Sequence, residues 1–271
     1  MELVQKDLFS PTPVARASAK CWKTTWTRIR PRFEAITGQP LRPGMKVMLL
    51  VHPDFHEAYG FSWIVSDVDP TYTLGDMARK RMEIVNQLKA EGVFDLQKEL
   101  PLPLFSQQIA VISSENAAGY GDFCSQLSNN DYGFSFMPVL FAAVMQGDGV
   151  EQSIVAALNA INAEADRFDV VVIIRGGGAT ADMSGFDTLL LAENVANFPL
   201  PVITGIGHER DECVLDMVSH TRVKTPTAAA ALLVDNLAQV WAHVTDCQRT
   251  ITQLVGQRMA SEPSRLDRLS T

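Results

Sequence analysis

Four side chains suited to phosphate and acid–base chemistry stand just after apolar segments of the sequence. Arg175 follows VVVII and opens an R-G-G-G run, whereas Asp122 lies a short distance beyond IAVISS. His208 and Asp211 follow the segment ITGIG. Arginine can bind a phosphate through two parallel hydrogen bonds, histidine can transfer a proton at neutral pH, and a nearby carboxylate can orient the imidazole. The set suits phosphoryl chemistry in which metal ions play a small part.

Glycines and one serine at the same segment ends are candidates to hold the phosphate. Glycine lets backbone N–H groups approach an anion closely, and the start of a following helix adds a favourable field. The candidates are Ser114, Gly176, Gly177, Gly178 and Gly207. Structural explanations also remain open, because R-G-G-G is typical of a tight turn and a histidine at a strand end is more often structural. The GxG of Gly205 and Gly207 lacks the third fingerprint glycine, which disfavours a dinucleotide site.

Patterns for metal binding are weak, and no metal site is assigned. His52 and His56 are four residues apart, but Pro53 between them prevents a helix that would place both on one face. Asp182 and Asp187 stand near the glycine run and can be considered as cation ligands. Capping of the helix that follows is the favoured role for these two carboxylates.

The elements that must position these residues alternate between strand and helix from Ile109 onward. Apolar segments that predict strands are 109–114, 134–145, 168–178 and 199–209, and helical spacing occurs at 117–127, 151–165, 188–197 and 211–218. Pro138 marks an edge position or a bend within the second of these strands. Such alternation predicts an α/β fold with a parallel sheet covered by helices on both faces. Ligands then bind outside the carboxyl ends of the strands.

The first hundred residues have a different pattern, rich in β-branched and aromatic residues with one helix. Residues 45–53 and 59–70 predict two strands joined by a turn at DFHEAYG. Helical spacing runs from 74 to 91, where Gly92 supplies a stop. The prolines of PLPLF, residues 101–105, predict a linker.

A long helix is predicted after Lys224-Thr225-Pro226-Thr227, where an alanine run begins. Its apolar residues follow alternating spacings of four and three, which is typical of a coiled-coil seam about three heptads long. The seam residues are Leu233, Leu237, Val240, Val244, Cys247, Ile251 and Leu254. The pattern stops at Arg258, so we expect a stripe that binds a partner helix or self-associates through Leu233–Leu254.

Composition excludes several classes of protein. The 271 residues are 46% hydrophobic and 20% charged, which is typical of globular proteins and rules out wholly disordered and fibrous chains. There is neither an 18-residue apolar stretch nor a visible signal peptide, so no membrane association is expected. Four widely spaced cysteines without a C-x-x-C pair argue against zinc sites and a disulfide framework. We expect a reduced, cytoplasmic protein.

The charge is unevenly distributed along the chain. The net charge is −8, yet residues 1–45 hold eight Lys or Arg against three Asp or Glu, and residues 109–205 hold two against eleven. A basic N-terminal end suits a polyanion such as nucleic acid, although a solvated basic surface is the other explanation. The candidate nucleic-acid-binding residues are Lys20, Lys23, Arg28 and Arg30.

Three segments in order and spacing carry a resemblance to a known family. IIRGGGATADMSGFD, ITGIGHERDECVLD and TRVKTPTAAAA resemble the exodeoxyribonuclease VII large subunit, whose pattern is R-G-G-G-S, then G-H-E-x-D, then D-x-R-A-x-T-P-x-A-A. Upstream, IAVISS…AAGYGDF and YTLGDMARKRMEIVNQLKAEGVFDLQKELPLP also resemble that family. The resemblance covers about residues 15–235.

The resemblance implies an exonuclease that degrades single-stranded DNA to oligonucleotides and nucleotides. It places the family's active-site residues on Asp122, Arg175, His208 and Asp211, and it implies a small helical subunit present in many copies. It also implies tolerance of chelators, so no cofactor is expected to be required, and Mg²⁺ is considered only as a stimulating ion. The segment 181–188 departs from the family pattern, which puts secondary roles there in question.

The resulting domain assignment has four parts. Residues 1–72 are expected to form a partial OB-like nucleic-acid-binding domain, 73–107 a helix and linker, 108–227 the three-layer α/β catalytic domain and 228–271 the start of a coiled-coil helix. We expect the chain to be part of a longer subunit and to digest DNA poorly by itself. Two alternatives stay open at this point, a non-catalytic single-stranded-DNA-binding scaffold and a sugar-nucleotide or dinucleotide enzyme.

Overall fold

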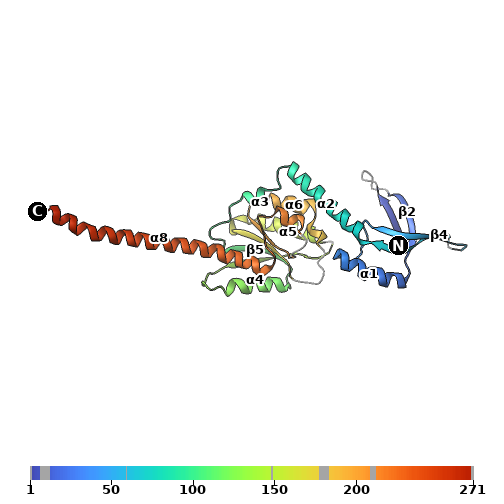
Figure 1. The fold of residues 1–271 in the computed structure, drawn as a ribbon, viewed down its shortest axis with the longest axis horizontal. Coiled ribbons are helices and arrows are strands. Elements are labelled where there is room, and N and C mark those ends of the chain that lie inside the picture. Colours follow the sequence, from blue (N-terminus) through green and yellow to red (C-terminus); the bar gives the residue numbers. More distant parts are fainter. Residues whose placement is uncertain are drawn as a thin grey trace.

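The computed structural model describes residues 2–6, 13–58, 60–147, 149–176, 183–207 and 212–269. Figure 1 shows a central α/β domain, a smaller sheet to one side of it and a long helix that extends away on the other. The strands are β1 (Glu2–Lys6), β2 (Pro13–Lys20), β3 (Met48–His56), β4 (Gly60–Asp69), β5 (Gln108–Ser113), β6 (Met137–Ala142), β7 (Val170–Ile174), β8 (Val202–Gly205) and β9 (Thr221–Arg222). The helices are α1 (Lys23–Thr37), α2 (Pro70–Ala90), α3 (Leu96–Glu99), α4 (Ala118–Ser128), α5 (Val150–Asn162), α6 (Leu189–Ala196), α7 (Val214–Val218) and α8 (Pro226–Leu269).

The central sheet has the order β6-β5-β7-β8-β9, and each neighbouring pair is parallel. Every residue of β7 is buried, as expected for an apolar run in a sheet covered on both faces. Pro138 lies in β6, the outermost strand, where its missing N–H costs no ladder hydrogen bond. The parallel sheet and the edge position of the proline confirm the prediction from the sequence.

Helices cover both faces of this sheet and make three layers. One core packs α4 and the first turns of α8 against the sheet, through residues that include Phe123, Leu127 and Leu233. The other core packs α5, α6 and α7, together with Leu88 of α2, against the opposite face. The expected three-layer α/β domain is therefore confirmed.

The N-terminal sheet has the order β1-β2-β4-β3 and is mixed, because β2 and β4 are parallel while the outer pairs are antiparallel. Its core also contains α1, which the sequence analysis did not expect. Pro31 inside α1 and its polar composition concealed this helix, but Ile29 and Phe33, four residues apart, are buried against Val65 and Val68. The OB-like character of this domain stays a prediction.

Two boundaries in this region differ from the predicted ones. The turn expected at DFHEAYG is shorter, because β3 continues through Pro53 to His56. Proline is tolerated there since β3 is an edge strand. Helix α2 begins at Pro70 instead of residue 74, because the Asp69 side chain accepts a hydrogen bond from the Thr71 N–H at 2.9 Å.

The seam predicted on α8 divides into a buried and an exposed part. Leu233 and Leu237 are buried in the α/β domain, whereas Val244, Ile251 and Leu254 are 50%, 62% and 58% exposed. The helix also continues beyond Arg258, where the heptad pattern stops. Residues 101–105 contain neither helix nor strand, as their prolines predicted, and their role as a linker stays a prediction. Across the described ranges, no helix has the length and apolar character needed to cross a bilayer.

Candidate active site

The strand order of the central sheet reverses between β5 and β7, and a cavity of about 510 Å³ opens there. Crevices outside the carboxyl ends of the strands at such a reversal are the usual ligand sites of open α/β sheets. Ser114 follows β5 and Arg175 and Gly176 follow β7, and all three line the cavity. Three residues selected from the sequence are thus brought together.

The N-terminus of α4 forms another wall of this cavity through Ala117 and Ala118. The cap residue Ala117 makes no side-chain hydrogen bond to the first turn of α4. The N–H groups of that turn are therefore not satisfied by a side-chain cap. A helix start of this kind favours an anion. A Cβ on Gly119 would lie 2.9 Å from both the Gly176 Cα and the Pro226 Cγ. Glycine is therefore required for the close approach of α4 to the end of β7.

Gly119 was not selected from the sequence, although a signal was present. The segment AAGYG is a run of small residues at the start of a predicted helix, directly after a strand. Such a run permits close contact between backbones. This signal indicates packing and does not reveal which backbone is approached.

Arg175 is held within the protein and does not extend into solvent. The residue is 5% exposed, its Nη1 lies 3.4 Å from the Met183 Sδ, and its backbone N–H donates to the Gly205 carbonyl at 3.4 Å. Met183 is the first described residue after the glycine-containing segment. Arg175 lines the cavity and its buried side chain is held against Met183, which reduces the conformational entropy that it would lose on binding an anion.

The other selected site residues are not all placed at this cavity. Asp122 is exposed on the second turn of α4 and is not among the lining residues. Gly207, at a φ of +82°, follows β8, where a Cβ would meet the Lys224 carbonyl at 3.2 Å. His208, Asp211, Gly177, Gly178 and Asp182 lie outside the described residues. The convergence of all four proposed catalytic residues stays a prediction.

The four basic residues selected for nucleic-acid binding are exposed on β2 and α1. Lys20 ends β2 and Lys23 begins α1. The Arg28 guanidinium donates to the Ser66 carbonyl at 3.0 Å, and Arg30 pairs with Glu34 at 2.7 Å. All four lie on the N-terminal domain, none of them lines the cavity described above, and their role in binding stays a prediction.

Asp187 does not cap the helix that follows it, contrary to the favoured expectation. Its carboxylate accepts two hydrogen bonds from the Arg81 Nε at 3.1 and 3.2 Å, one from the Arg81 Nη2 at 2.6 Å and one from the Val214 N–H at 2.7 Å. Asp187 thus joins α2 to the start of α7. Burial raises the pKa of Asp187, although the hydrogen bonds from Arg81 and Val214 oppose that shift.

We expect Asp187→Ala to lower the free energy of unfolding by about 2–3 kcal/mol, because it removes a charged acceptor from a partly buried guanidinium and from a backbone N–H. Adding Arg81→Met should recover part of that loss, since the buried charge then disappears together with its partner. Urea denaturation of the four proteins of this double-mutant cycle measures the coupling. Purely additive changes would contradict the assignment. Asp95→Asn, in an exposed pair with Lys98, is the control and should change stability little.

Polar contacts also fix the chain that follows residues 208–211. Arg222 pairs with Glu212 at 3.3 Å and with Asp216 at 3.7 Å. Cys213 lies between Glu212 and Asp216 in the sequence. Burial and the nearby Asp216 carboxylate raise its pKa well above the ordinary value. Cys213 therefore stays a thiol at neutral pH, which argues against a role as nucleophile or metal ligand.

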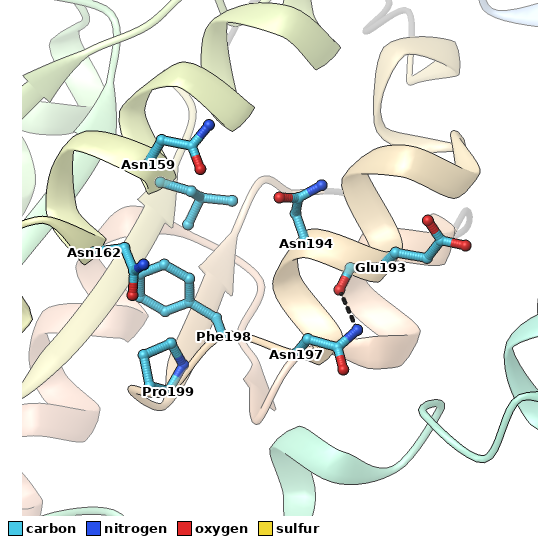
Figure 2. Close-up of a pocket in the computed structure, with 8 residues that line it drawn as sticks. Asn159, Asn162, Glu193, Asn194, Asn197, Phe198 and Pro199 are labelled. Carbon is cyan, nitrogen blue, oxygen red and sulfur yellow. Dashed lines mark hydrogen bonds between the residues drawn. The ribbon is translucent and has the colours of Figure 1, made fainter.

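Figure 2 shows a second pocket, between the C-terminal ends of α5 and α6. Asn159, Asn162 and Asn194 contribute amides to it, and Asn197 donates to the Glu193 carbonyl at 2.9 Å. Both helices run back from the carboxyl edge of the sheet, so this pocket lies at the opposite edge from Arg175. It contains no cationic side chain and is not suited to a phosphate.

Comparison with known proteins identifies the family. Residues 93–271 match the family described as "Exonuclease VII, large subunit". The chain belongs to the exonuclease VII large-subunit family. It is 37% identical over 242 residues to the exodeoxyribonuclease 7 large subunit of Deinococcus radiodurans, covering 86% of this chain and 58% of that protein. The large subunits of a Cyanothece species and of Xanthomonas euvesicatoria are 38% and 32% identical, over 76% and 94% of this chain.

The chain thus spans about half the length of these exonuclease VII large subunits, 48% to 58%. The family match begins at residue 93, so it includes the whole α/β domain and α8. It confirms the resemblance that the spaced motifs indicated. Within the described residues, no group of three or more His, Cys, Asp or Glu side chains is arranged to hold a metal ion.

Proposed function

We propose that this chain carries the phosphodiester-hydrolysing core of an exodeoxyribonuclease that degrades single-stranded DNA to oligonucleotides and nucleotides. The observation that carries the proposal is the cavity at the strand reversal, where Ser114, Arg175, Gly176 and the N-terminus of α4 meet. Membership of the exonuclease VII large-subunit family supports it. The alternative of a non-catalytic DNA-binding scaffold is less favoured, because its support was limited to the altered segment 181–188.

In the proposed mechanism, water attacks the phosphorus atom and the P–O bond to the leaving nucleotide breaks. Arg175 binds the scissile phosphate and stabilises the charge on its non-bridging oxygens, helped by the N–H groups of α4. His208 transfers a proton, to the leaving oxygen or from the attacking water, and Asp211 orients its imidazole. Asp122 positions the water or shares in the proton transfer.

A direct test uses end-labelled DNA. Purified protein is incubated with matched single-stranded and duplex oligonucleotides, and the products are resolved by length. The proposal expects cleavage of the single strand and little or none of the duplex. Binding without cleavage would favour the scaffold, and the absence of both binding and cleavage would favour an enzyme acting on a small ligand.

We expect substantial activity to remain in excess EDTA, because the proposed groups supply both charge stabilisation and proton transfer without a metal. Initial rates on labelled single-stranded DNA with EDTA and with added Mg²⁺ measure this. Moderate stimulation by Mg²⁺ agrees with the expectation. Complete loss in EDTA that Mg²⁺ restores would instead point to carboxylate ligands, and Asp182 and Asp187 would be tested first.

The partner of this chain is proposed to be the small subunit of the same exonuclease, in many copies, bound along α8. The outer seam residues Val244, Ile251 and Leu254 are half or more exposed and form the apolar stripe that such a partner requires. Self-association through Leu233–Leu254 is the second candidate. Leu233 and Leu237 are buried in the α/β domain, so self-association would use the outer part of the seam.

We expect Val244→Glu/Ile251→Glu to weaken association with the small subunit at least tenfold, because each charge would enter an apolar interface. Light scattering after gel filtration, with and without the small subunit, measures both kinds of complex. The control Thr245→Glu/Thr252→Glu places two charges at the same spacing on the side of the helix away from the seam. Equal assembly of both variants would contradict a role for the stripe.

We also place the enzyme in the cytoplasm. Its four cysteines are free thiols, which is the state expected in a reducing compartment.

A further inference from the structure

A third cavity, of about 370 Å³ and called the cleft below, lies between residues 39–46, helix α2 and the segment that begins at Met183. It shares no lining residue with the cavity at Arg175. Four cations line it, against two carboxylates. These residues are Arg42, Lys46, Lys80, Arg81, Asp76 and Asp187.

The two carboxylates of this cleft are already engaged by cations. The Asp76 side chain, 7% exposed, lies 3.6 Å from the Lys46 Nζ, 3.0 Å from the Lys80 Nζ and 2.9 Å from the Arg79 Nη2. Burial alone would raise the pKa of Asp76, but the bonds from Arg79 and Lys80 outweigh burial and lower it. Asp187 is bound by Arg81, as described above. Neither carboxylate is therefore available to repel an incoming anion strongly.

The lysines of the cleft keep donors for a ligand. The side chains of Lys46 and Lys80 are 56% and 58% exposed although both contact Asp76. Each ammonium has three donors, so the contact with Asp76 fixes its position and leaves N–H groups directed toward solvent. The result is a pair of anchored ammonium groups at the mouth of a concave surface.

The position of the cleft connects it with the proposed active site. Ser184, on its wall, comes two residues after the glycine-containing segment 177–182. Asp187, also on its wall, is hydrogen-bonded to the start of α7, which follows residues 208–211. Helix α2 passes from the N-terminal sheet to the α/β domain (Figure 1). Its residues between 73 and 81 contribute to the lining of the cleft. The cleft is therefore joined through the chain to the segment that follows Arg175 and to the segment that carries His208 and Asp211.

We infer that this cleft binds the sugar–phosphate backbone of single-stranded DNA on its way to the cavity at Arg175, through Arg42, Lys46 and Lys80. The inference rests on the proposed function and adds a substrate path to it. Its volume is near the lower end for small-molecule pockets, which are about 300–1,000 Å³, and this is enough for a short stretch of one strand. A positively charged groove that follows the backbone is how proteins bind single strands without reading their sequence.

The test measures binding separately from cleavage. Lys46→Glu/Lys80→Glu is compared with Lys89→Glu/Lys98→Glu, which makes the same change in net charge beside the Phe94 ring. Lys89 lies about 14 Å from Lys80 along α2. The dissociation constant of fluorescein-labelled oligothymidylate is measured in EDTA across a series of salt concentrations.

We expect the cleft variant to bind at least about tenfold more weakly at 0.1 M salt than the control variant. Its plot of log affinity against log salt should be less steep by about 1.4, since each phosphate contact on a single strand contributes roughly 0.7. The milder Lys46→Gln/Lys80→Gln, confirmed as folded by its melting curve, should shift both quantities in the same direction. Affinities and slopes equal to those of the control variant would overturn the inference.

Cleavage assays distinguish this inference from the proposed function. If the wild-type chain binds DNA through the cleft but cleaves none, the path stands and the nuclease proposal fails. If it cleaves DNA and the cleft variants bind and cleave like the control, the nuclease proposal stands and the path fails.

Discussion

Arg175→Lys is expected to slow the cleavage of single-stranded DNA by at least about a hundredfold, nearly as much as Arg175→Ala. Removal of one preorganised donor to a developing charge typically costs 10² to 10³ in rate, and the guanidinium supplies two parallel donors. A lysine ammonium is a point charge that cannot reproduce this fork. The buried setting of Arg175 strengthens the expectation, because a shorter or differently shaped head group cannot adjust freely there.

Initial rates at saturating DNA, together with melting curves, measure the effect and separate it from loss of fold. Arg167→Lys is the matched control, because Arg167 is an exposed residue paired with Glu164 on the surface. It should cleave DNA at the wild-type rate. Near-normal digestion by Arg175→Lys would show that the arginine supplies charge alone, and the bidentate role would have to be withdrawn.

Gly119→Ala is expected to destabilise the protein by about 1–3 kcal/mol and to reduce cleavage at the same time. The added Cβ would meet the Gly176 Cα, the Pro226 Cγ and the Arg175 carbonyl at 2.9, 2.9 and 3.1 Å, and two of these contacts are with backbone atoms. Overpacking of a well-packed site costs free energy of this size because the neighbours must move. Here the neighbours include the end of β7 that presents Arg175.

Gly121→Ala supplies a control in the same helix. A Cβ on Gly121 meets nothing within 4 Å, so alanine should leave stability unchanged or raise it by up to about 1 kcal/mol. For a domain of this size the loss at Gly119 corresponds to a melting temperature roughly 3–10 °C lower. If both alanine variants melted together, α4 would not approach β7 as closely as described.

The central sheet could be predicted from the sequence because its signals are local. The run Val170–Ile174 is apolar throughout, and such a run before glycines indicates a strand buried on both faces. Because parallel strands end at the same edge of a sheet, the carboxyl ends of β5 and β7 were expected to lie close together. Ser114 and Arg175, which follow these ends, could therefore be selected from the sequence.

The features that could not be predicted depend on contacts distant in sequence. Arg81 and Asp187 are 106 residues apart, and nothing near either residue indicates the pairing. Helix α1 contains Pro31, which locally argues against a helix, yet Ile29 and Phe33 are buried against the sheet and outweigh it. The cleft likewise depends on Lys46 and Lys80 meeting around Asp76.

The division of α8 into a packed and an exposed part has a consequence for how it meets a partner. An isolated helix must first form a costly nucleus, with an equilibrium constant of about 10⁻³. In α8 the turns around Leu233 are fixed by the α/β domain, so the outer turns only have to propagate an existing helix. The stripe at Val244 and Ile251 is therefore ordered before a partner arrives. Association then loses less conformational entropy, and affinity is gained without any additional contact.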